Sequence, residues 1–281
     1  MGWAYKMLNI NNLIVCYTFR IFKKRWMSKL GVENKFIDVS DYGRPVANII
    51  AEALTNTRVT AIHITLLFGV SGILAIVYML KSQFWLAGFF LILKSILDAA
   101  DGQLARIKNE PSYTGRYLDS IFDSLLNFAL IISIAVFTGT NTWLALLAFI
   151  CMQTQGTVYN YYHVIFRHHT AGEITSQIFE DEVPTAYPGE RQVHVNVLYW
   201  LFRVLYKVFD KLVYTIDPRA SIQTECPKWF MFLVSFYGLG FQLLIIAVFM
   251  AAGWIGMIIP FFIGYSILIP VFVGIRRVYL R

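Results

Sequence analysis

The stretch SILDAADGQLARIKNEPSYTGRYLDSIFDSLLNF, residues 95–128, places four aspartates between apolar runs. They are Asp98, Asp101, Asp119 and Asp123. A charged side chain at the centre of a membrane-spanning helix costs about 2.5–3.5 kcal/mol on insertion scales. Because four carboxylates in one such stretch are costly, we expect them to serve a function.

The whole composition is that of a membrane protein. Of 281 residues, 57% are hydrophobic and 15% are charged, against about 25% charged residues in soluble domains. Apolar runs of about 20 residues, enough to cross the hydrocarbon layer, recur along the chain. They predict an all-α integral membrane fold with six spans near 59–80, 84–106, 114–138, 142–165, 229–251 and 254–275. Since these runs are continuous, short alternating strands of a barrel are a poor fit.

Basic residues predict the orientation. They gather before the first expected span, after the second and fourth, and at the C-terminus, whereas the opposite turns hold only Lys81. By the positive-inside rule, both termini and the carboxylates lie on the cytoplasmic side. The net charge of +7 then reflects topology and attraction to anionic lipid head groups. No basic stripe with interleaved aromatics indicates nucleic-acid binding, and no cleavable signal peptide is expected.

Two parts make up the expected domain organisation. Residues 1–44 form an amphipathic juxtamembrane segment, and residues 45–281 form the six-helix membrane domain. Within the latter, residues 166–228 comprise a cytoplasmic loop and a helix over 194–214. Apolar residues including Leu198 and Leu205 lie on one face of that helix and charged residues on the other, which predicts a helix lying in the plane of the membrane.

Helical periodicity brings the aspartates together. One face of the second expected span holds Asp98, Asp101, Gly102 and Ala105, and one stripe of the third holds Gly115, Asp119 and Asp123. Pro111 separates the two helices, so we expect an antiparallel hairpin whose acidic faces meet. Carboxylate oxygens suit Mg²⁺ or Mn²⁺ rather than zinc. Two such ions with Arg106 nearby would bind a pyrophosphate and support phosphoryl displacement.

A transporter is the competing class of function. Buried carboxylates also form divalent-cation and proton pathways. Transporters commonly have repeated halves or helices broken near the midplane, and the sequence indicates neither. The pattern therefore favours an enzyme.

The acidic stretch resembles the signature of the CDP-alcohol phosphotransferase family: D, two residues, D-G, two residues, A-R, about eight residues, G, three residues, D, three residues, D. The fixed positions are matched by Asp98, Asp101, Gly102, Ala105, Arg106, Gly115, Asp119 and Asp123. The resemblance implies a phospholipid-synthesis enzyme, generally a homodimer, that uses a CDP-alcohol donor and releases CMP. It also implies two divalent ions held by the four aspartates, with Asp123 as general base for the acceptor hydroxyl.

The remaining signature residues would bind the nucleotide. The resemblance implies that Gly102, Ala105 and Gly115 leave room for cytidine and that Arg106 contacts the donor phosphate. Upstream, TRVTAIHIT (57–65) resembles a family stretch reading V-T-P-N, two residues, T. Thr60 and Thr65 match, and Thr60 is a candidate nucleotide contact, whereas Ala61 and Ile62 replace the usual proline and asparagine.

The placement of basic residues predicts whether the acceptor is charged. A phosphorylated acceptor needs Arg or Lys near the metals, and the last two spans have none in their interiors. Near the right depth the candidates are Lys94, Arg116 and the RHH stretch of residues 167–169, which contains Arg167. We therefore favour an uncharged lipid alcohol such as diacylglycerol with CDP-ethanolamine or CDP-choline, as in the amino-alcohol phosphotransferases. The alternative is transfer from CDP-diacylglycerol to a small polar alcohol of the inositol, glycerol or serine type.

Two further features have open interpretations. His163, in YYHVIFRHHTAGEI (161–174), stands where the resemblance to the amino-alcohol enzymes suggests an acid/base partner; a histidine bonded to a neighbouring carbonyl or head group is the alternative. Five glycines of the last two spans are expected to permit close helix packing. They are Gly238, Gly240, Gly253, Gly256 and Gly264.

Overall fold

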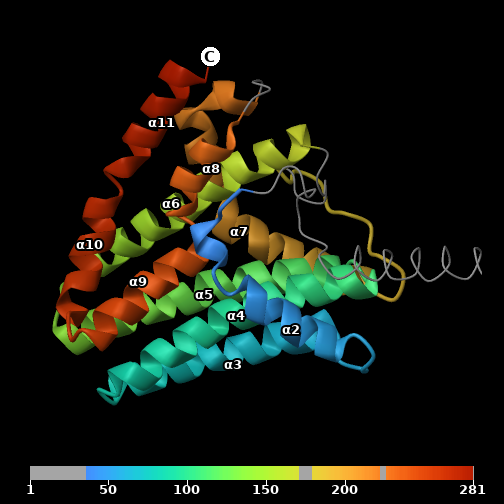
Figure 1. The fold of residues 1–281 in the computed structure, drawn as a ribbon, viewed down its shortest axis with the longest axis horizontal. Helices are drawn as coiled ribbons and strands as arrows, with labels where there is room; N and C mark the ends of the chain where they lie inside the picture. The colour runs from blue at the N-terminus through green and yellow to red at the C-terminus, as the bar shows by residue number, and fades with distance from the viewer. Residues whose placement is uncertain (1–35, 171–178, 222–225, 281) are drawn as a thin grey trace, which may run out of the picture.

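The computed structural model describes residues 36–170, 179–221 and 226–280 (Figure 1). Every regular element in these ranges is a helix, which confirms the all-α prediction for them. The longer helices are α2 (Arg44–Leu54), α3 (Ala61–Leu80), α4 (Phe84–Lys108), α5 (Tyr113–Thr138), α6 (Thr142–His169), α7 (Gln192–Ile216), α8 (Lys228–Ser235), α9 (Leu239–Ala251), α10 (Ile258–Tyr265) and α11 (Leu268–Tyr279). Short 3-10 helices are η2 (Val39–Asp41), η3 (Pro218–Ser221) and η4 (Ile255–Met257). Most of the expected amphipathic segment 1–44 lies outside the described residues.

Four helical stretches are long and apolar enough to cross a membrane: Ala61–Leu80, Tyr113–Thr138, Lys228–Ala251 and Ile255–Tyr279. They correspond to four of the six expected spans. The other two coincide with α4 and α6, which have 25 and 28 residues and are therefore of spanning length. Their polar content, such as the acidic motif in α4, lowers their hydropathy. The count of six spans stays a prediction.

The last two expected spans are interrupted, so the prediction of unbroken helices was wrong. The first of them ends as α8 at Ser235 and resumes as α9 at Leu239; the second is interrupted between Tyr265 and Leu268. At the first break, η2 packs against the chain. The backbone N–H of Val39 donates to Ser235 Oγ at 3.1 Å.

Two of the five glycines permit this close approach. A Cβ at Gly240 would lie 2.0 Å from the Ser40 carbonyl oxygen, and one at Gly238 would lie 2.3 Å from the Ser40 side chain. The packing prediction is thus confirmed for these two: the partner of both is η2, and a Cβ at Gly240 would also lie 3.0 Å from Ser95 Oγ of α4. It was wrong for Gly256 and Gly264, where an added Cβ would meet nothing within 4 Å. Gly253 instead has φ +75° in the turn after α9, a conformation that favours glycine.

The helices that carry the aspartates are held by α3. Asn109, in the left-handed conformation, ends α4, and the Ser112 hydroxyl accepts from Gly115 N–H to cap α5. The chain thus reverses around Pro111 as predicted. However, α4 and α5 make few direct backbone approaches, whereas α3 packs against both (Figure 1). Side chains, rather than helix packing, therefore bridge α4 and α5.

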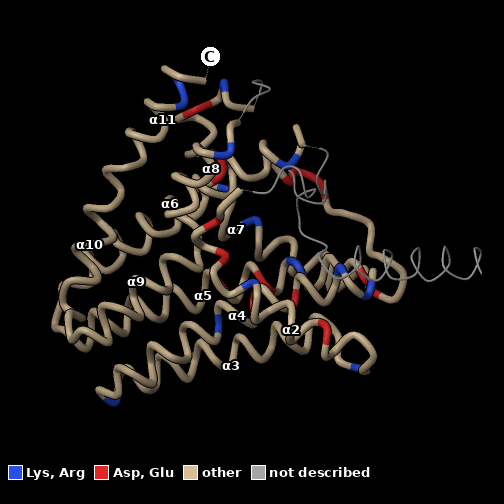
Figure 2. Tube along the Cα trace, in the orientation of Figure 1, with Lys and Arg blue, Asp and Glu red and all other residues tan. Residues whose placement is uncertain are grey.

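Charge divides the molecule. Figure 2 shows acidic and basic residues gathered away from α9 and α10, and neither of these helices contains a charged residue. A buried apolar cluster that includes Met79, Leu91, Ile134 and Ile246 fills that part of the bundle. The acidic motif therefore lies in the halves of α4 and α5 that are away from this apolar cluster.

Helix α7 packs on α5 and α6. Leu198, Phe202 and Leu205 are half-buried against a core that contains Tyr117. A second apolar row is exposed: Val193, Val197, Trp200, Leu201, Val204, Val208 and Leu212. The apolar residues predicted for one face thus divide between two, because part of them packs on α5. An orientation in the membrane plane stays a prediction.

Candidate active site

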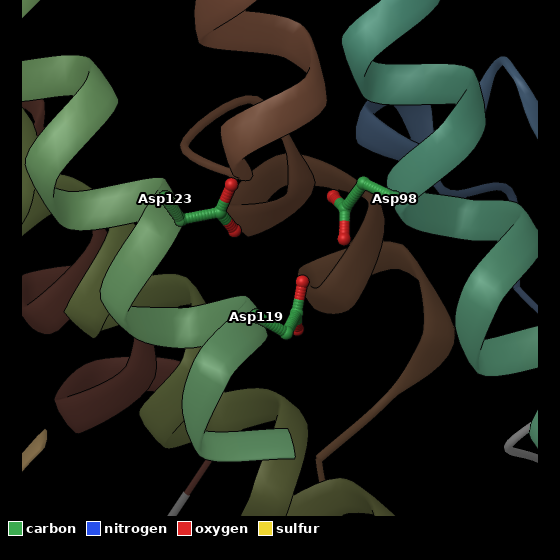
Figure 3. Close-up of side chains that lie close together, drawn as sticks. All are labelled: Asp98, Asp119 and Asp123. Atoms are coloured by element: carbon green, nitrogen blue, oxygen red, sulfur yellow. The ribbon is translucent and has the colours of Figure 1, made fainter. Parts of the chain in front are cut away.

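Three of the four motif aspartates converge. Asp98 comes from α4, whereas Asp119 and Asp123 lie one turn apart on α5 (Figure 3). One carboxylate oxygen from each lies within 4.8 Å of the others. The acidic faces therefore meet across the space between α4 and α5, as the helical spacing predicted.

The fourth aspartate, Asp101, has a different partner. Asp101 is buried, and its Oδ2 accepts a hydrogen bond of 2.6 Å from the Thr65 hydroxyl on α3. It is absent from the group of converging oxygens. Thr65 also donates to the Ala61 carbonyl at 3.1 Å, within its own helix. The structure thus links Asp101 to the start of α3 and leaves a three-aspartate cluster, defined as Asp98, Asp119 and Asp123.

A buried lysine completes the surroundings of the cluster. Lys94 is 1% exposed, and its Nζ lies 2.5 Å from Asp123 Oδ1. The ammonium also lies over the Phe68 ring of α3, 5.0 Å from the centroid. From the sequence, Lys94 was predicted only to be a basic residue at a suitable depth. Its position four residues before Asp98, on the same helical face, was the signal that could have connected it with the aspartates.

The three-aspartate cluster fits a hard divalent cation. All its candidate ligands are carboxylate oxygens, the donors that Mg²⁺ and Mn²⁺ prefer. Asp119 Oδ1 is buried and has no hydrogen-bond partner among the described residues. A buried carboxylate oxygen without a partner is costly. An ion at this position would satisfy it and would offset the repulsion between the carboxylates.

The predicted nucleotide-binding residues lie at the ends of the same helices. A Cβ on Gly102 would lie 3.5 Å from a guanidinium nitrogen of Arg106, so this arginine folds back over the glycine. Arg106 also donates to Gln103 Oε1 at 3.2 Å. A Cβ on Gly115 would lie 3.2 Å from Ser112 Oγ. Ala105, between them in sequence, is half-buried.

Thr60 has a structural role. It is the N-cap of α3; its backbone N–H donates to His63 Nδ1 at 3.1 Å, and its hydroxyl lies 2.7 Å from the same nitrogen. His163 is buried in α6, with its ring stacked on Tyr159 and edge-on to Phe36. It is not part of the three-aspartate cluster.

The basic residues considered for an anionic acceptor have partners. Lys94 binds Asp123, and Arg116 binds Glu180. Arg116 also lies over the Tyr117 ring, 5.1 Å from the centroid. Arg167 is buried in α6.

Residues 179–191, here termed the strap, cover the start of α5, a contact that was not predicted from the sequence. Glu190 accepts hydrogen bonds from the Ser112 hydroxyl and from the backbone N–H groups of Tyr113 and Thr114. Partial burial opposes ionisation of Glu190, but these hydrogen bonds outweigh it and lower the pKa of this carboxyl. Tyr187 stacks on Tyr113 with centroids 4.8 Å apart. The strap therefore fixes the beginning of the helix that carries Asp119 and Asp123.

Comparison with protein families gives the class of this site. The model of the CDP-alcohol phosphatidyltransferase family matches residues 50–216, more than half of the chain and all of the acidic motif. The chain therefore belongs to the CDP-alcohol phosphatidyltransferase family. A comparison with curated proteins gave no match.

Membership confirms the resemblance seen in the motif. The protein is an integral membrane transferase of phosphorus-containing groups in phospholipid biosynthesis, with a CDP-alcohol as donor and an alcohol as acceptor. The family uses divalent cations. The interrupted last spans weaken the sequence argument against a transporter, which relied on the lack of broken helices. The preference for an enzyme rests instead on membership of a transferase family.

Proposed function

We propose that this enzyme transfers a phosphoethanolamine or phosphocholine group from the CDP-linked donor to a lipid alcohol such as diacylglycerol, with release of CMP. The observation that carries the catalytic part is the convergence of Asp98, Asp119 and Asp123 within 4.8 Å. Neutralisation of Lys94 by Asp123 and of Arg116 by Glu180 supports an uncharged acceptor.

The aspartates are proposed as ligands of two divalent ions, Mg²⁺ or Mn²⁺. Asp98, Asp119 and Asp123 would bind directly, and Asp101 would join them by exchanging its hydrogen bond with Thr65 for a metal ion. When bound, such ions neutralise the donor pyrophosphate and stabilise the departing phosphate of CMP.

Asp123 is proposed as the general base. Its carboxylate takes the proton of the acceptor hydroxyl while the oxygen forms a bond to the phosphorus that carries the donor alcohol. The bond from this phosphorus to the bridging oxygen breaks, and CMP leaves with the electron pair. Lys94, bound to Oδ1 of Asp123, leaves Oδ2 available for the acceptor or a metal ion.

Donor binding is assigned to the ends of α4 and α5. Gly102, Ala105 and Gly115 would leave space for cytidine, and Arg106 would turn from Gln103 toward the donor phosphate. Thr60 is retained as a nucleotide contact through its position at the start of α3. His163 is proposed as an acid/base partner near the acceptor.

The active site and both termini are proposed to lie on the cytoplasmic side of the membrane. The basic residues that flank the predicted spans support a cytoplasmic active site and cytoplasmic termini. A homodimer is proposed from the family resemblance, with surrounding membrane lipids as further partners.

A substrate matrix tests the proposal. The purified full chain would be incubated with Mg²⁺ or Mn²⁺ and with CDP-ethanolamine, CDP-choline or CDP-diacylglycerol. Each donor is paired with diacylglycerol, inositol, glycerol 3-phosphate or serine, and CMP and lipid products are measured. We expect CMP release with the first two donors and diacylglycerol. Turnover confined to CDP-diacylglycerol and a small polar alcohol would refute this choice of substrates.

A further inference from the structure

Lys94 is a cation built into the proposed metal site. It lies in α4, one turn before Asp98, and its ammonium reaches across to Asp123 on α5. Because α4 and α5 make few direct backbone approaches, this ion pair is one of the contacts that bridge them. The ammonium therefore lies among the carboxylates and not on the outer surface of the helix.

The surroundings of Lys94 are costly for a charge. Its side chain is 1% exposed, and the ring of Phe68 covers it. Desolvating an ammonium carries a large penalty that a single carboxylate only partly offsets. Asp98 and Asp119, which lie beside Asp123, provide the additional negative potential. In return, the lysine offsets part of their mutual repulsion when no divalent ion is bound.

The same charge acts against metal binding. A divalent ion held by Asp98, Asp119 and Asp123 would lie near the ammonium, and like charges in a site of low dielectric repel strongly. The lysine also occupies Oδ1 of Asp123. A site with Lys94 therefore holds a divalent ion less tightly than the same aspartates would without it.

We propose that Lys94 is a positioning residue and resident counter-ion that fixes Asp123 and keeps the bound divalent ions exchangeable. The inference rests on the proposed metal site. By holding one oxygen of Asp123, Lys94 orients this carboxylate, and by its charge it prevents permanent metal occupancy. Tight binding of the ions then requires the negative charge of the donor pyrophosphate, so that metal and donor bind cooperatively.

The test measures metal binding directly, without turnover. Mn²⁺ affinity of the full chain in detergent would be determined by electron paramagnetic resonance for wild type, Lys94→Met, Lys94→Arg and Lys81→Met. Lys94→Met removes the charge but keeps an unbranched apolar side chain. We expect it to bind Mn²⁺ about tenfold more tightly, because the repulsion is gone. Its kcat should fall, because Asp123 is no longer held.

The controls separate charge from packing. Lys94→Arg keeps the positive charge and therefore the repulsion, so it should bind Mn²⁺ within about threefold of wild type. Lys81→Met makes the same chemical change at an exposed position beyond the end of α3 and should leave affinity unchanged. If Lys94 had only a structural role, Lys94→Met would lose packing around the cluster and would bind Mn²⁺ more weakly than wild type.

Unchanged or weaker Mn²⁺ binding by folded Lys94→Met would overturn the proposal. If this variant does not fold, Lys94→Gln replaces it under the same criterion. Failure of the metal site itself has a separate signature: wild type would not bind Mn²⁺, or Asp119→Asn would bind it as well as wild type.

Discussion

Two buried ion pairs in this protein have opposite surroundings. Asp217, after α7, is 1% exposed and accepts hydrogen bonds of 2.7 Å from Arg276 Nε and from the Tyr162 hydroxyl. Tyr161 donates to its backbone carbonyl at 2.8 Å. Asp123 pairs with Lys94, but Asp98 and Asp119 lie beside it, and one oxygen of Asp119 has no hydrogen-bond partner among the described residues.

The difference indicates that the Asp217–Arg276 pair is structural, whereas the Asp123–Lys94 pair belongs to a binding site. Around Asp217, the Arg276 guanidinium and the Tyr162 hydroxyl both donate to one carboxylate, and these contacts join the ends of α6, α7 and α11. Around Asp123, one ammonium faces several carboxylates. The first arrangement is complete in the protein alone, whereas the second has excess negative charge that a cation would compensate. Substitutions in the two places should therefore have different consequences.

The largest expected effect is at the incomplete cluster. Asp119→Asn should lower CMP release by about 10³-fold, because it removes a charged metal ligand. The fold should persist, since the substitution is nearly isosteric. Turnover with saturating CDP-ethanolamine and diacylglycerol checks this, with Asp181→Asn as control because that side chain is 71% exposed. Activity within threefold of wild type would remove Asp119 from the mechanism.

Breaking the complete pair should affect stability instead. Arg276→Met leaves Asp217 buried without its main cation and should lower the free energy of unfolding by about 3 kcal/mol. Thermal unfolding in detergent measures the loss, and Arg219→Met, at an exposed position, is the matched control. Mn²⁺ affinity of the folded variant should equal that of wild type. A large change in affinity would show that the two regions are coupled.

Added Mn²⁺ should also distinguish the three-aspartate cluster from the region around Asp217, through its effect on stability. Mn²⁺ at about 100 times its Kd should stabilise wild type by about 2.7 kcal/mol, because the ion binds the folded state. Thermal shift with and without a chelator measures this effect. Arg276→Met should keep the shift, whereas Asp119→Asn should lose it. Equal shifts in both variants would place the bound ion outside the three-aspartate cluster.

The smallest expected effect concerns the strap. Glu190→Gln weakens the charged cap on Ser112, Tyr113 and Thr114 and should cost about 1 kcal/mol of local stability. Hydrogen exchange of the first turn of α5 measures it. Glu182→Gln is the control, because Glu182 is an exposed residue of the same segment. Equal protection in both variants would contradict the capping role.

The strap should also respond to acid. The pKa of Glu190 is lowered from its ordinary 4.5 in the folded state. Its stabilising effect is therefore complete above about pH 4.5 and is lost as the pH falls through the lowered folded pKa. Limited proteolysis of the strap across this range should show increasing cleavage at the acidic end. Glu190→Gln should remove that dependence, and an unchanged profile would exclude Glu190 as its source.

Much of the fold could be predicted from apolar runs and from Pro111, since hydrophobic length and chain reversal are local properties. The interruption at residues 235–239 was not predicted, although Ser235, Gly238 and Gly240 are residue types at which helices commonly kink. It depends on Ser40 approaching Gly238 and Gly240, residues far away in the chain. Periodicity likewise could not divide the apolar residues of α7 between protein and surface, because both faces are apolar.

For the site, helical spacing predicted that Asp98, Asp119 and Asp123 converge. It also predicted Asp101 among them, because residues 98 and 101 share a helical face. Packing of α3 changed that outcome by presenting the Thr65 hydroxyl to Asp101. The pairing of Lys94 with Asp123 likewise depends on tertiary structure, which a single sequence does not supply. The metal and substrate roles of these residues stay predictions.

The contact between Val39 and Ser235 also constrains biosynthesis. The two residues are 196 positions apart, and the Ser40 backbone lies close to Gly240, further along the chain. A ribosome makes the N-terminal partner long before the C-terminal one exists. η2 can therefore dock only after α8 and the start of α9 have been synthesised, so this contact forms late in the folding of the chain.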